Sequence, residues 1–297
     1  MLQMMLAMLF AHVILFPSGK ICPKEKDVRG RSVDPRAMDY CVYKDFDWTD
    51  YEIWEQEKFT VKNGDYEIPV FYFPGEKTAK IAIVVHGFGQ NHFAVLPQAK
   101  VFRDLGYSVL MMDQRRFGES KAKYCSLGYM EAMDVARICD FAKECLGAEK
   151  IVLNGVSMGA VSIMRASLYT KNIDALIPDC GYADIKTEIP FLYKSMFKTG
   201  NPFAARFLFW RAHRLGFPME DTVPIDAIEK AEFPVCIIHS DADGAVRVED
   251  AYRISRKCRN SNSRLVIFRG VEHGLSIADG EKYASVVKDF LNCIETR

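Results

Sequence analysis

The chain has 297 residues, of which 49% are hydrophobic and 26% are charged, as is typical of a globular protein and not of a disordered or fibrous one. Lys plus Arg and Asp plus Glu are balanced at 39 each, so no net field attracts nucleic acid, and we expect a small-molecule partner. The nine cysteines are scattered without a C-x-x-C pair, which predicts neither a disulfide framework nor a zinc site. We expect no metal and no cofactor.

The N-terminal residues 1–16 are apolar apart from Gln3 and His12. A helix of this length, at about 1.5 Å per residue, falls short of a bilayer core of about 30 Å. No Lys or Arg precedes Pro17, unlike in a secretory signal, and the basic residues that follow favour the cytoplasmic side for the rest of the chain. We therefore expect a membrane anchor that the catalytic domain does not need. An exported form, a packed helix and a wrong start site stay open as alternatives.

Residues 17–55 are predicted to form a linker and a lead-in helix, and residues 56–297 one domain. Two strand-like stretches flank Asn63-Gly64, the strongest short hairpin signal. Uninterrupted apolar runs, which suit strands buried on both faces of a parallel sheet, follow at 81–85, 107–112, 151–156, 174–178, 234–239 and 264–268. Helix-like stretches lie at 92–104, 128–146, 158–170, 248–259 and 280–294. This order predicts an α/β fold with a mostly parallel, doubly wound sheet and an N-terminal antiparallel hairpin.

The segment "NGVSMGA" places Ser157 at the centre of a G-x-S-x-G motif, between a predicted strand and a predicted helix. In a nucleophile elbow the serine occupies a strained turn, and the flanking glycines avoid collisions with neighbouring backbone. The turn exposes the hydroxyl and directs the free N–H groups of the following helix toward the substrate. The position of the motif in the strand and helix order therefore predicts that Ser157 is a nucleophile.

Four further segments accompany the elbow in chain order: "VVHGFGQNH" (84–92), "DQRRFGES" (113–120), "HSDADGAVRVEDA" (239–251) and "GVEHG" (270–274). With them, residues 56–294 resemble the α/β-hydrolase superfamily, specifically bacterial serine hydrolases of its esterase-like or prolyl-oligopeptidase-like branch. The resemblance implies an α/β-hydrolase fold with a catalytic serine, acid and histidine. The sequence departs from the family pattern at Ser240 and Arg116, where glycine is common, and neither position carries a catalytic side chain.

A serine hydroxyl needs a base to take its proton as it attacks a carbonyl group, and histidine suits that task. His273 follows the last predicted strand in a Gly-rich loop and completes the chain order Ser, Asp, His of this fold. The other five histidines are interpreted as structural or surface residues. The acid is expected after the strand that ends at His239, where the family spacing favours Asp243. Asp241 is interpreted as a turn former.

The oxyanion that forms during attack needs N–H donors already directed at it, and the resemblance implies that backbone supplies them. One donor is the residue after the nucleophile, Met158, and the other is Phe88, after the third strand. His86 is expected to brace that loop, and Asp113 and Arg115 are interpreted as loop-stabilising partners.

An insertion at about 182–230 is longer than a simple crossover requires, and by the resemblance it forms a small helical cap over the active site. An amphipathic helix pair packed on the sheet edge and a membrane-contacting face are the alternatives. Its aromatic residues are expected to line an acyl pocket: Phe191, Tyr193, Phe197, Phe203, Phe207, Phe209, Trp210 and Phe217.

We conclude from the sequence that the protein is a serine hydrolase that cleaves carboxylic esters through a Ser157 acyl-enzyme, with His273 as base and Asp243 as its orienting acid. A peptidase or amidase with the same residues is the alternative within enzymes. A non-catalytic binding protein with this fold is the alternative in another class, and the complete set of three residues argues against it. Serine at the elbow, where a dehalogenase carries Asp, disfavours dehalogenase chemistry.

Overall fold

The computed structural model of the chain describes residues 2–17, 25–26, 32–33 and 54–295. The predicted linker and lead-in helix of residues 17–55 therefore lie almost entirely outside the described residues. Within that range, β1 (Glu25–Lys26) and β2 (Ser32–Val33) form a short antiparallel pair.

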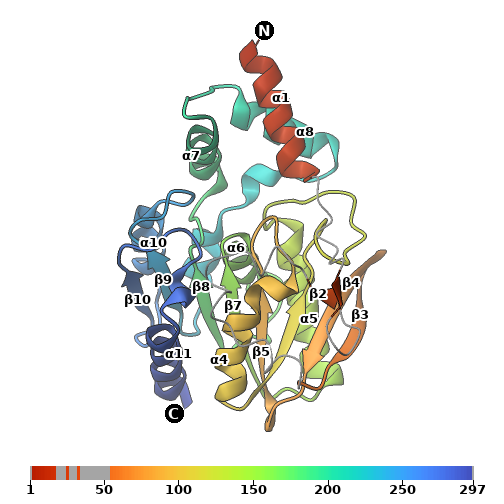
Figure 1. Cartoon of the computed structure of the whole chain (residues 1–297), viewed down its shortest axis with the longest axis vertical. Coiled ribbons are helices and arrows are strands. Elements are labelled where there is room, and N and C mark those ends of the chain that lie inside the picture. The colour runs from red at the N-terminus through yellow and green to blue at the C-terminus, as the bar shows by residue number, and fades with distance from the viewer. Residues whose placement is uncertain (1, 18–24, 27–31, 34–53, 296–297) are drawn as a thin grey trace.

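Eight strands form one twisted sheet in the order β10-β9-β8-β7-β5-β6-β4-β3 (Figure 1). β4 is antiparallel to both of its neighbours, and the other neighbouring strands run parallel. The predicted mostly parallel sheet with an N-terminal antiparallel hairpin is confirmed. The strands are β3 (Glu57–Asn63), β4 (Tyr66–Phe73), β5 (Lys77–Val85), β6 (Tyr107–Met112), β7 (Lys150–Val156), β8 (Ala175–Asp179), β9 (Cys236–Ser240) and β10 (Arg264–Phe268).

The apolar runs of the sequence form the centre of this sheet. Every residue of β6 is buried, as is every residue of β7 after Lys150, because helices cover both faces. The edge hairpin of β3 and β4 turns at Asn63-Gly64, where Gly64 has a φ of 58° that glycine adopts without strain.

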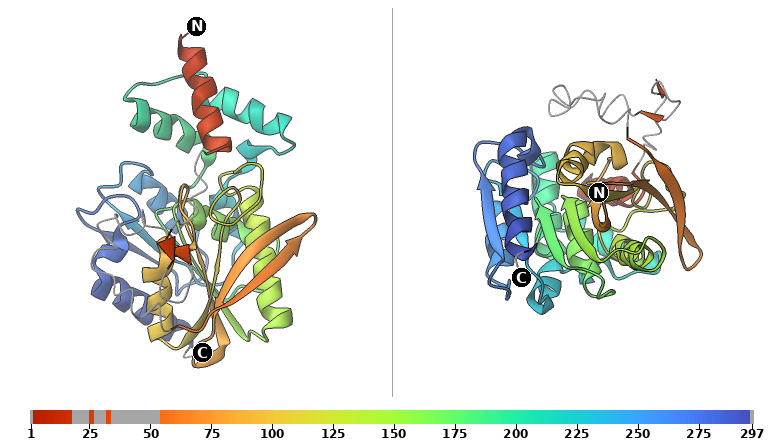
Figure 2. Two further views of the ribbon diagram at one scale, coloured as in Figure 1. Left: turned by 45° about the vertical axis from the view of Figure 1, so that its right-hand side comes forward. Right: turned by 90° about the horizontal axis from the view of Figure 1, so that it is seen from below.

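Helices pack on both faces of the sheet (Figure 2). On one face, Phe102 and Phe290 belong to a common core, to which α4 (Leu96–Asp104) and α11 (Gly280–Glu295) contribute. The other face is covered by α5 (Met130–Cys145), α6 (Met158–Ala166), α9 (Pro224–Lys230) and α10 (Val248–Ser255). The parallel strands therefore end together at one edge of the sheet, where α/β proteins place their sites.

The chain between β8 and β9 extends beyond that edge of the sheet. It forms α7 (Ile185–Phe197), α8 (Ala204–Arg214) and the short 3-10 helix η3 (Met219–Asp221) before it returns through α9. α7 and α8 lie above the carboxyl ends of the strands (Figures 1 and 2).

The apolar N-terminal residues form α1 (Leu2–Leu15), which packs against α7 and α8. The Phe10 ring lies 5.1 Å from the Tyr193 ring, and the Asn201 side chain donates a hydrogen bond of 2.7 Å to the Gln3 carbonyl. This packing differs from the expectation of a segment that the domain does not need, and matches the packed-helix alternative. In the described ranges, no helix is both long enough and apolar enough to cross a membrane. We call α1, α7 and α8 together the cap.

Candidate active site

Ser157 occupies the sharp turn between β7 and α6, with φ 57° and ψ −118°. Its N–H donates a hydrogen bond of 2.8 Å to the Asp179 carbonyl. The flanking glycines are required by close backbone contacts: a Cβ on Gly155 would lie 2.4 Å from the Gly159 carbonyl oxygen, and one on Gly159 would lie 2.2 Å from the Val85 carbonyl oxygen. The turn therefore has the geometry of a nucleophile elbow.

His273 lies between the two other side chains that the sequence singles out. Its Nε2 is 2.8 Å from Ser157 Oγ, and its Nδ1 is 2.6 Å from Asp243 Oδ2. Asp241 is directed elsewhere, because its Oδ1 accepts a hydrogen bond of 2.7 Å from the Gly270 N–H. The structure thus brings together Ser157, His273 and Asp243 and leaves Asp241 outside, where its side chain joins two loops instead of forming a local turn.

Asp243 is held as an anion. Burial opposes its ionisation, but the hydrogen bond and the charge interaction with His273 and the backbone N–H groups of Ala245 and Val246 hold its pKa below the ordinary value. His239 also lies near it, 3.4 Å from Asp243 Oδ2, and burial lowers the pKa of His239, so a neutral ring contacts the carboxylate. An ionised Asp243 favours the His273 tautomer that carries a proton on Nδ1 and leaves Nε2 free to accept one.

The two residues expected to supply oxyanion donors, Met158 and Phe88, both lie beside Ser157. Met158 is the first residue of α6, so its N–H has no acceptor within the helix. Phe88 follows β5, and both residues line the same cavity as Ser157. Their roles as oxyanion donors stay predictions, and their position beside Ser157 is compatible with these roles.

The loop after β5 is braced as expected. His86 Nε2 accepts a hydrogen bond of 2.9 Å from the Gln114 N–H, and burial lowers the pKa of His86 to about 4. Asp113 accepts bonds from the His92 N–H and ring and from the Glu119 N–H. The predicted structural roles of His86 and Asp113 are confirmed.

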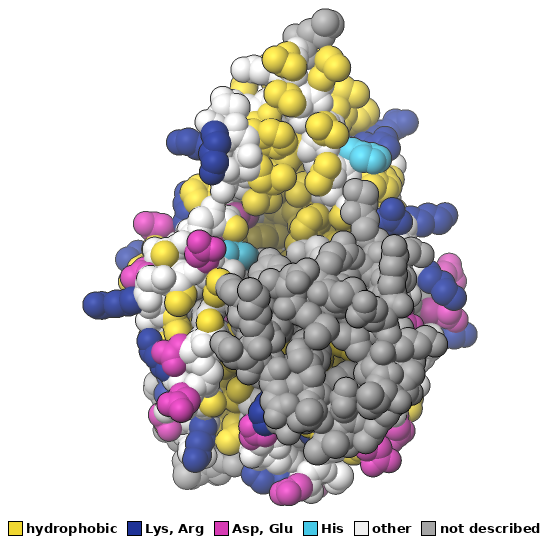
Figure 3. Space-filling view, in the orientation of Figure 1, with side chains coloured by type: hydrophobic (Ala, Val, Ile, Leu, Met, Phe, Trp, Pro, Cys, Tyr) yellow, Lys and Arg dark blue, Asp and Glu magenta, His cyan; other side chains and the backbone are white. Residues whose placement is uncertain are grey.

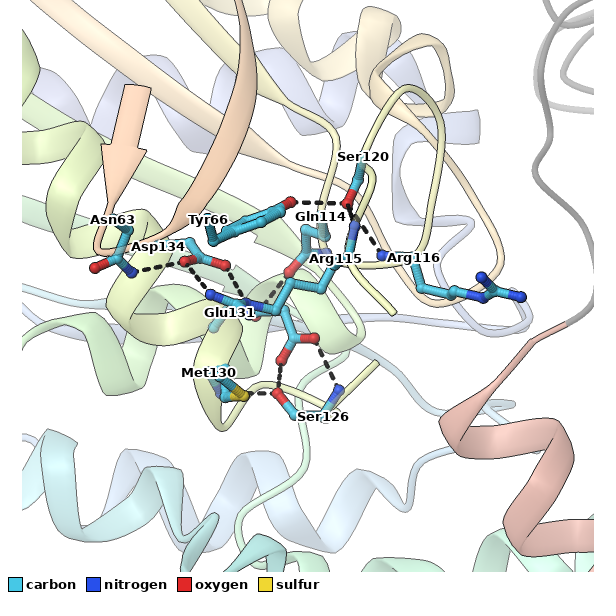
Figure 4. Close-up of polar contacts among 12 residues, drawn as sticks. Asn63, Tyr66, Gln114, Arg115, Arg116, Ser120, Ser126, Met130, Glu131 and Asp134 are labelled. Atoms are coloured by element: carbon cyan, nitrogen blue, oxygen red, sulfur yellow. Dashed lines mark hydrogen bonds and ion pairs between the residues drawn. The ribbon is translucent and has the colours of Figure 1, made fainter. Parts of the chain in front are cut away.

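A second polar network fastens the loop after β6 (Figure 4). Arg115 makes a two-point ion pair with Asp134, at 2.6 and 2.8 Å, and stacks 4.2 Å above the Tyr66 ring. Burial raises the pKa of Asp134 to about 6 despite this pairing. Arg116, where the family has glycine, has a φ of 75°, which explains the usual glycine. The predicted loop-stabilising role of Arg115 is confirmed.

Ser157 lies between two cavities of different character. One has a volume of about 290 Å³ and is lined mainly by apolar side chains. The other has a volume of about 90 Å³ and includes Gln98, whose buried Oε1 has no hydrogen-bond partner among the described residues. His273 and Phe88 line both cavities.

The walls of the larger cavity correct the expectation that the aromatic residues of the insertion line an acyl pocket. α7 contributes Ile189, Leu192 and Met196, and α1 contributes Val13 and Ile14. The aromatic residues pack elsewhere: Tyr193 and Phe197 contact each other and α1, and Phe207 and Trp210 line a separate groove. Composition alone does not show which side of a helix faces the site.

Glu188 is a buried carboxyl in the wall of the larger cavity, and sequence reasoning missed it. Its Oε2 has no hydrogen-bond partner among the described residues. Burial raises its pKa to about 8, and nearby Asp250 adds to the shift. At neutral pH a protonated, uncharged Glu188 therefore faces the cavity.

Asp179 is another buried carboxyl that the sequence did not indicate. Its carbonyl accepts the Ser157 N–H, and its Oδ1 accepts a hydrogen bond of 3.1 Å from Ser276 Oγ. Burial raises its pKa to about 7. Asp179 therefore helps to hold the backbone of the elbow in place through its hydrogen bond with the Ser157 N–H.

One group of described residues has potential metal-ligand atoms within 4.8 Å of one another: Cys180, Asp243 and His273. Burial raises the pKa of the Cys180 thiol well above its ordinary value, so the thiolate that a metal prefers is disfavoured. His273 Nδ1 is already hydrogen-bonded to Asp243. The group is better suited to proton transfer than to metal binding.

Comparison with known proteins agrees with this fold. A family model for the alpha/beta hydrolase fold matches residues 80–216. An uncharacterized protein of Bacillus subtilis, YqkD, is 27% identical over 296 residues, which cover 97% of this chain and 92% of that protein. The matched segment and the order of the strands in the sheet show that the chain has the α/β-hydrolase fold.

Two solved structures illustrate the range of its structural neighbours. The esterase Pf2001 of Pyrococcus furiosus superimposes with a TM-score of 0.69 at 21% identity, over 84% of this chain and 96% of that one. The acylaminoacyl peptidase of Pyrococcus horikoshii gives 0.64 at 17% identity, over 84% of this chain and 43% of that one. At these identities the two likenesses show the fold that this chain shares with an esterase and a peptidase.

Proposed function

We propose that this protein is a serine hydrolase that cleaves carboxylic esters through an acyl-enzyme on Ser157. The observation that carries the proposal is the hydrogen-bonded series from Ser157 through His273 to Asp243, at the junction of an apolar and a more polar cavity. Such a series activates a hydroxyl that is otherwise a weak nucleophile.

In the proposed reaction, His273 Nε2 takes the proton of Ser157 as Oγ attacks the ester carbonyl. The N–H groups of Phe88 and Met158 donate to the oxyanion of the tetrahedral intermediate. The intermediate collapses, and His273 returns the proton to the departing alcohol. A water molecule then repeats the sequence on the acyl-enzyme and releases the carboxylic acid. Asp243 stabilises the imidazolium in both halves of the reaction.

We assign the two halves of the proposed ester to the two cavities from the character of their walls. The larger cavity offers aliphatic walls to an acyl chain, and the uncharged form of Glu188 is compatible with an apolar group there. The smaller cavity, with Gln98 in its wall, suits a short or polar alcohol. Amide cleavage would additionally require a site that anchors a peptide, so we favour esters.

A serine-reactive fluorophosphonate probe and a panel of p-nitrophenyl esters of graded acyl length test the proposal. We expect the probe to label the wild-type chain on Ser157 and not Ser157→Ala, and ester hydrolysis to disappear with the labelling. Equal labelling of both chains, or an unlabelled wild type that hydrolyses none of the esters, would contradict the proposal.

A further inference from the structure

The outer side of the cap carries a continuous set of exposed apolar side chains (Figure 3). α1 is unusual because it contains no Asp, Glu, Lys or Arg, and its only polar side chains are Gln3 and His12. One side packs on α7 through Phe10, while Leu9, on the other side, is 53% exposed. We define the apolar face by its exposed residues: Leu2, Met4, Met5, Met8, Leu9, Val13, Met196, Phe203 and Trp210. Exposed faces of this kind mark interaction surfaces.

A groove of about 280 Å³ crosses this face between α1 and α8. Its walls are Met4, Ala7, Phe203, Phe207 and Trp210, and the Arg206 side chain completes it. An aliphatic chain fits the apolar part of such a groove, and a guanidinium binds a phosphate through two parallel hydrogen bonds. These are the two halves of a phospholipid.

Basic side chains flank the apolar face on two sides (Figure 3). Between residues 185 and 217 the sole acidic side chain is Glu188, and it is buried. The same stretch carries exposed basic residues: Lys186, Lys194, Lys198, Arg206, Arg211 and Arg214. A second copy packed on this face would bring two sets of basic side chains together, whereas anionic headgroups would compensate their charge.

We propose that the apolar face docks the protein on an anionic lipid surface, with α1 lying in the plane of the interface. A helix of 14 residues spans about 21 Å, too short to cross a bilayer but sufficient to lie in its surface. Val13 and Met196 belong to the apolar face and also line the cavity that holds Ser157. If the protein is the esterase proposed above, an acyl chain therefore enters the site from the lipid.

Co-sedimentation of the full chain with vesicles tests the docking without requiring turnover. The probes are vesicles of phosphatidylcholine alone and vesicles that also contain phosphatidylglycerol. We expect binding to the mixed vesicles, weaker binding to the neutral ones, and a loss of binding with added salt. The emission of the exposed Trp210 shifts to shorter wavelength on binding, and Trp210→Phe removes that shift.

Vesicle binding by variants in the apolar face is compared with binding by variants at exposed positions outside the cap. The double variant Met5→Glu with Leu9→Glu is expected to weaken vesicle binding by at least about tenfold, because it places two charges in the interface. Arg206→Glu is expected to weaken it by about fivefold or more. The controls Leu168→Glu and Lys288→Glu, exposed positions outside the cap, are expected to bind like the wild type.

Equal binding by the double variant and the controls, or no binding to the mixed vesicles, would overturn the proposal. So would light scattering that finds a wild-type dimer and a monomeric double variant, because the face would then join two copies. Ser157→Ala is expected to bind vesicles like the wild type. A failure of the proposed esterase activity would thus leave the docking result intact, and the two proposals fail separately.

Discussion

Val13 of helix α1 and Ser157 of the elbow line the same cavity of about 290 Å³, although they lie far apart in the sequence. The apolar N-terminal segment is therefore a wall of the candidate active site as well as a partner of α7 and α8. Changes in α1 should alter substrate preference and not only the location of the protein.

Val13→Trp is predicted to shorten the acyl cavity. Each methylene excluded from it removes up to about 0.8 kcal/mol, or about fourfold in kcat/KM, so hydrolysis of the longer esters should fall while that of acetate stays unchanged. Steady-state kinetics on p-nitrophenyl esters of graded length measure this. Leu9→Trp, an exposed position of α1 that does not line the cavity, is the control. An unchanged length profile for Val13→Trp would show that α1 does not shape the pocket.

Asp243→Asn is predicted to lower kcat by on the order of 10⁴, because the amide favours the wrong tautomer of His273. Asp241→Asn is its matched control and should change kcat little, since the Asp241 side chain bonds the Gly270 N–H and not His273. Both variants are compared with wild type in the ester assay, after circular dichroism has confirmed that they fold. A larger loss of kcat for Asp241→Asn than for Asp243→Asn would show that Asp241, and not Asp243, is the acid.

Much of the fold could be predicted because it depends on local patterns. The apolar runs of β6 and β7 reflect burial on both faces, and Asn63-Gly64 reflects the turn that it forms. The elbow and the loop that carries His273 are also short segments with their own signatures. Because each of these segments follows a strand of the parallel sheet, Ser157, Asp243 and His273 meet at the same edge of the sheet.

The features that sequence reasoning missed depend on tertiary packing. Gln3 and His12 are the only polar residues of α1 and do not define a polar side, so its place on the cap could not be predicted from its pattern. In α8 the aromatic composition suggested a pocket lining, but Phe207 and Trp210 line an outer groove, and only the folded chain shows this. Glu188 and Asp179 look like ordinary acidic residues in the sequence, and only burial in the folded chain raises their pKa values.

Gly159→Ala is predicted to disrupt the elbow, because its Cβ would lie 2.2 Å from the Val85 carbonyl oxygen, so that backbone would have to shift. We expect a loss of several kcal/mol in the free energy of unfolding, as for overpacking in a rigid core, and loss of ester hydrolysis. Urea denaturation measures the stability. Gly200→Ala is the control, since no atom lies within 4 Å of its added Cβ. Equal stability of the two variants would mean that the close contact at the elbow relaxes easily.

Glu188→Gln is predicted to stabilise the protein increasingly as the pH rises. Glu188 titrates near 4.5 when exposed and near 8 in the folded chain, because burial disfavours its charged form. Between these values the folded chain holds a proton that the unfolded chain has released, so wild-type stability falls as pH rises through this window. The neutral amide of Gln lacks this dependence. The variant should therefore match wild type in Tm in acid and have a higher Tm at about pH 8. The corresponding gain in the free energy of unfolding is on the order of a few kcal/mol.

Differential scanning calorimetry between pH 4 and pH 8 measures the difference in Tm. Asp179, whose pKa is also raised, contributes equally to both chains and cancels. Glu249→Gln, at an exposed position of α10, should show no such trend. A Tm difference that stays constant with pH would show that Glu188 is charged in the folded protein, and the cavity wall would then present an anion to the substrate.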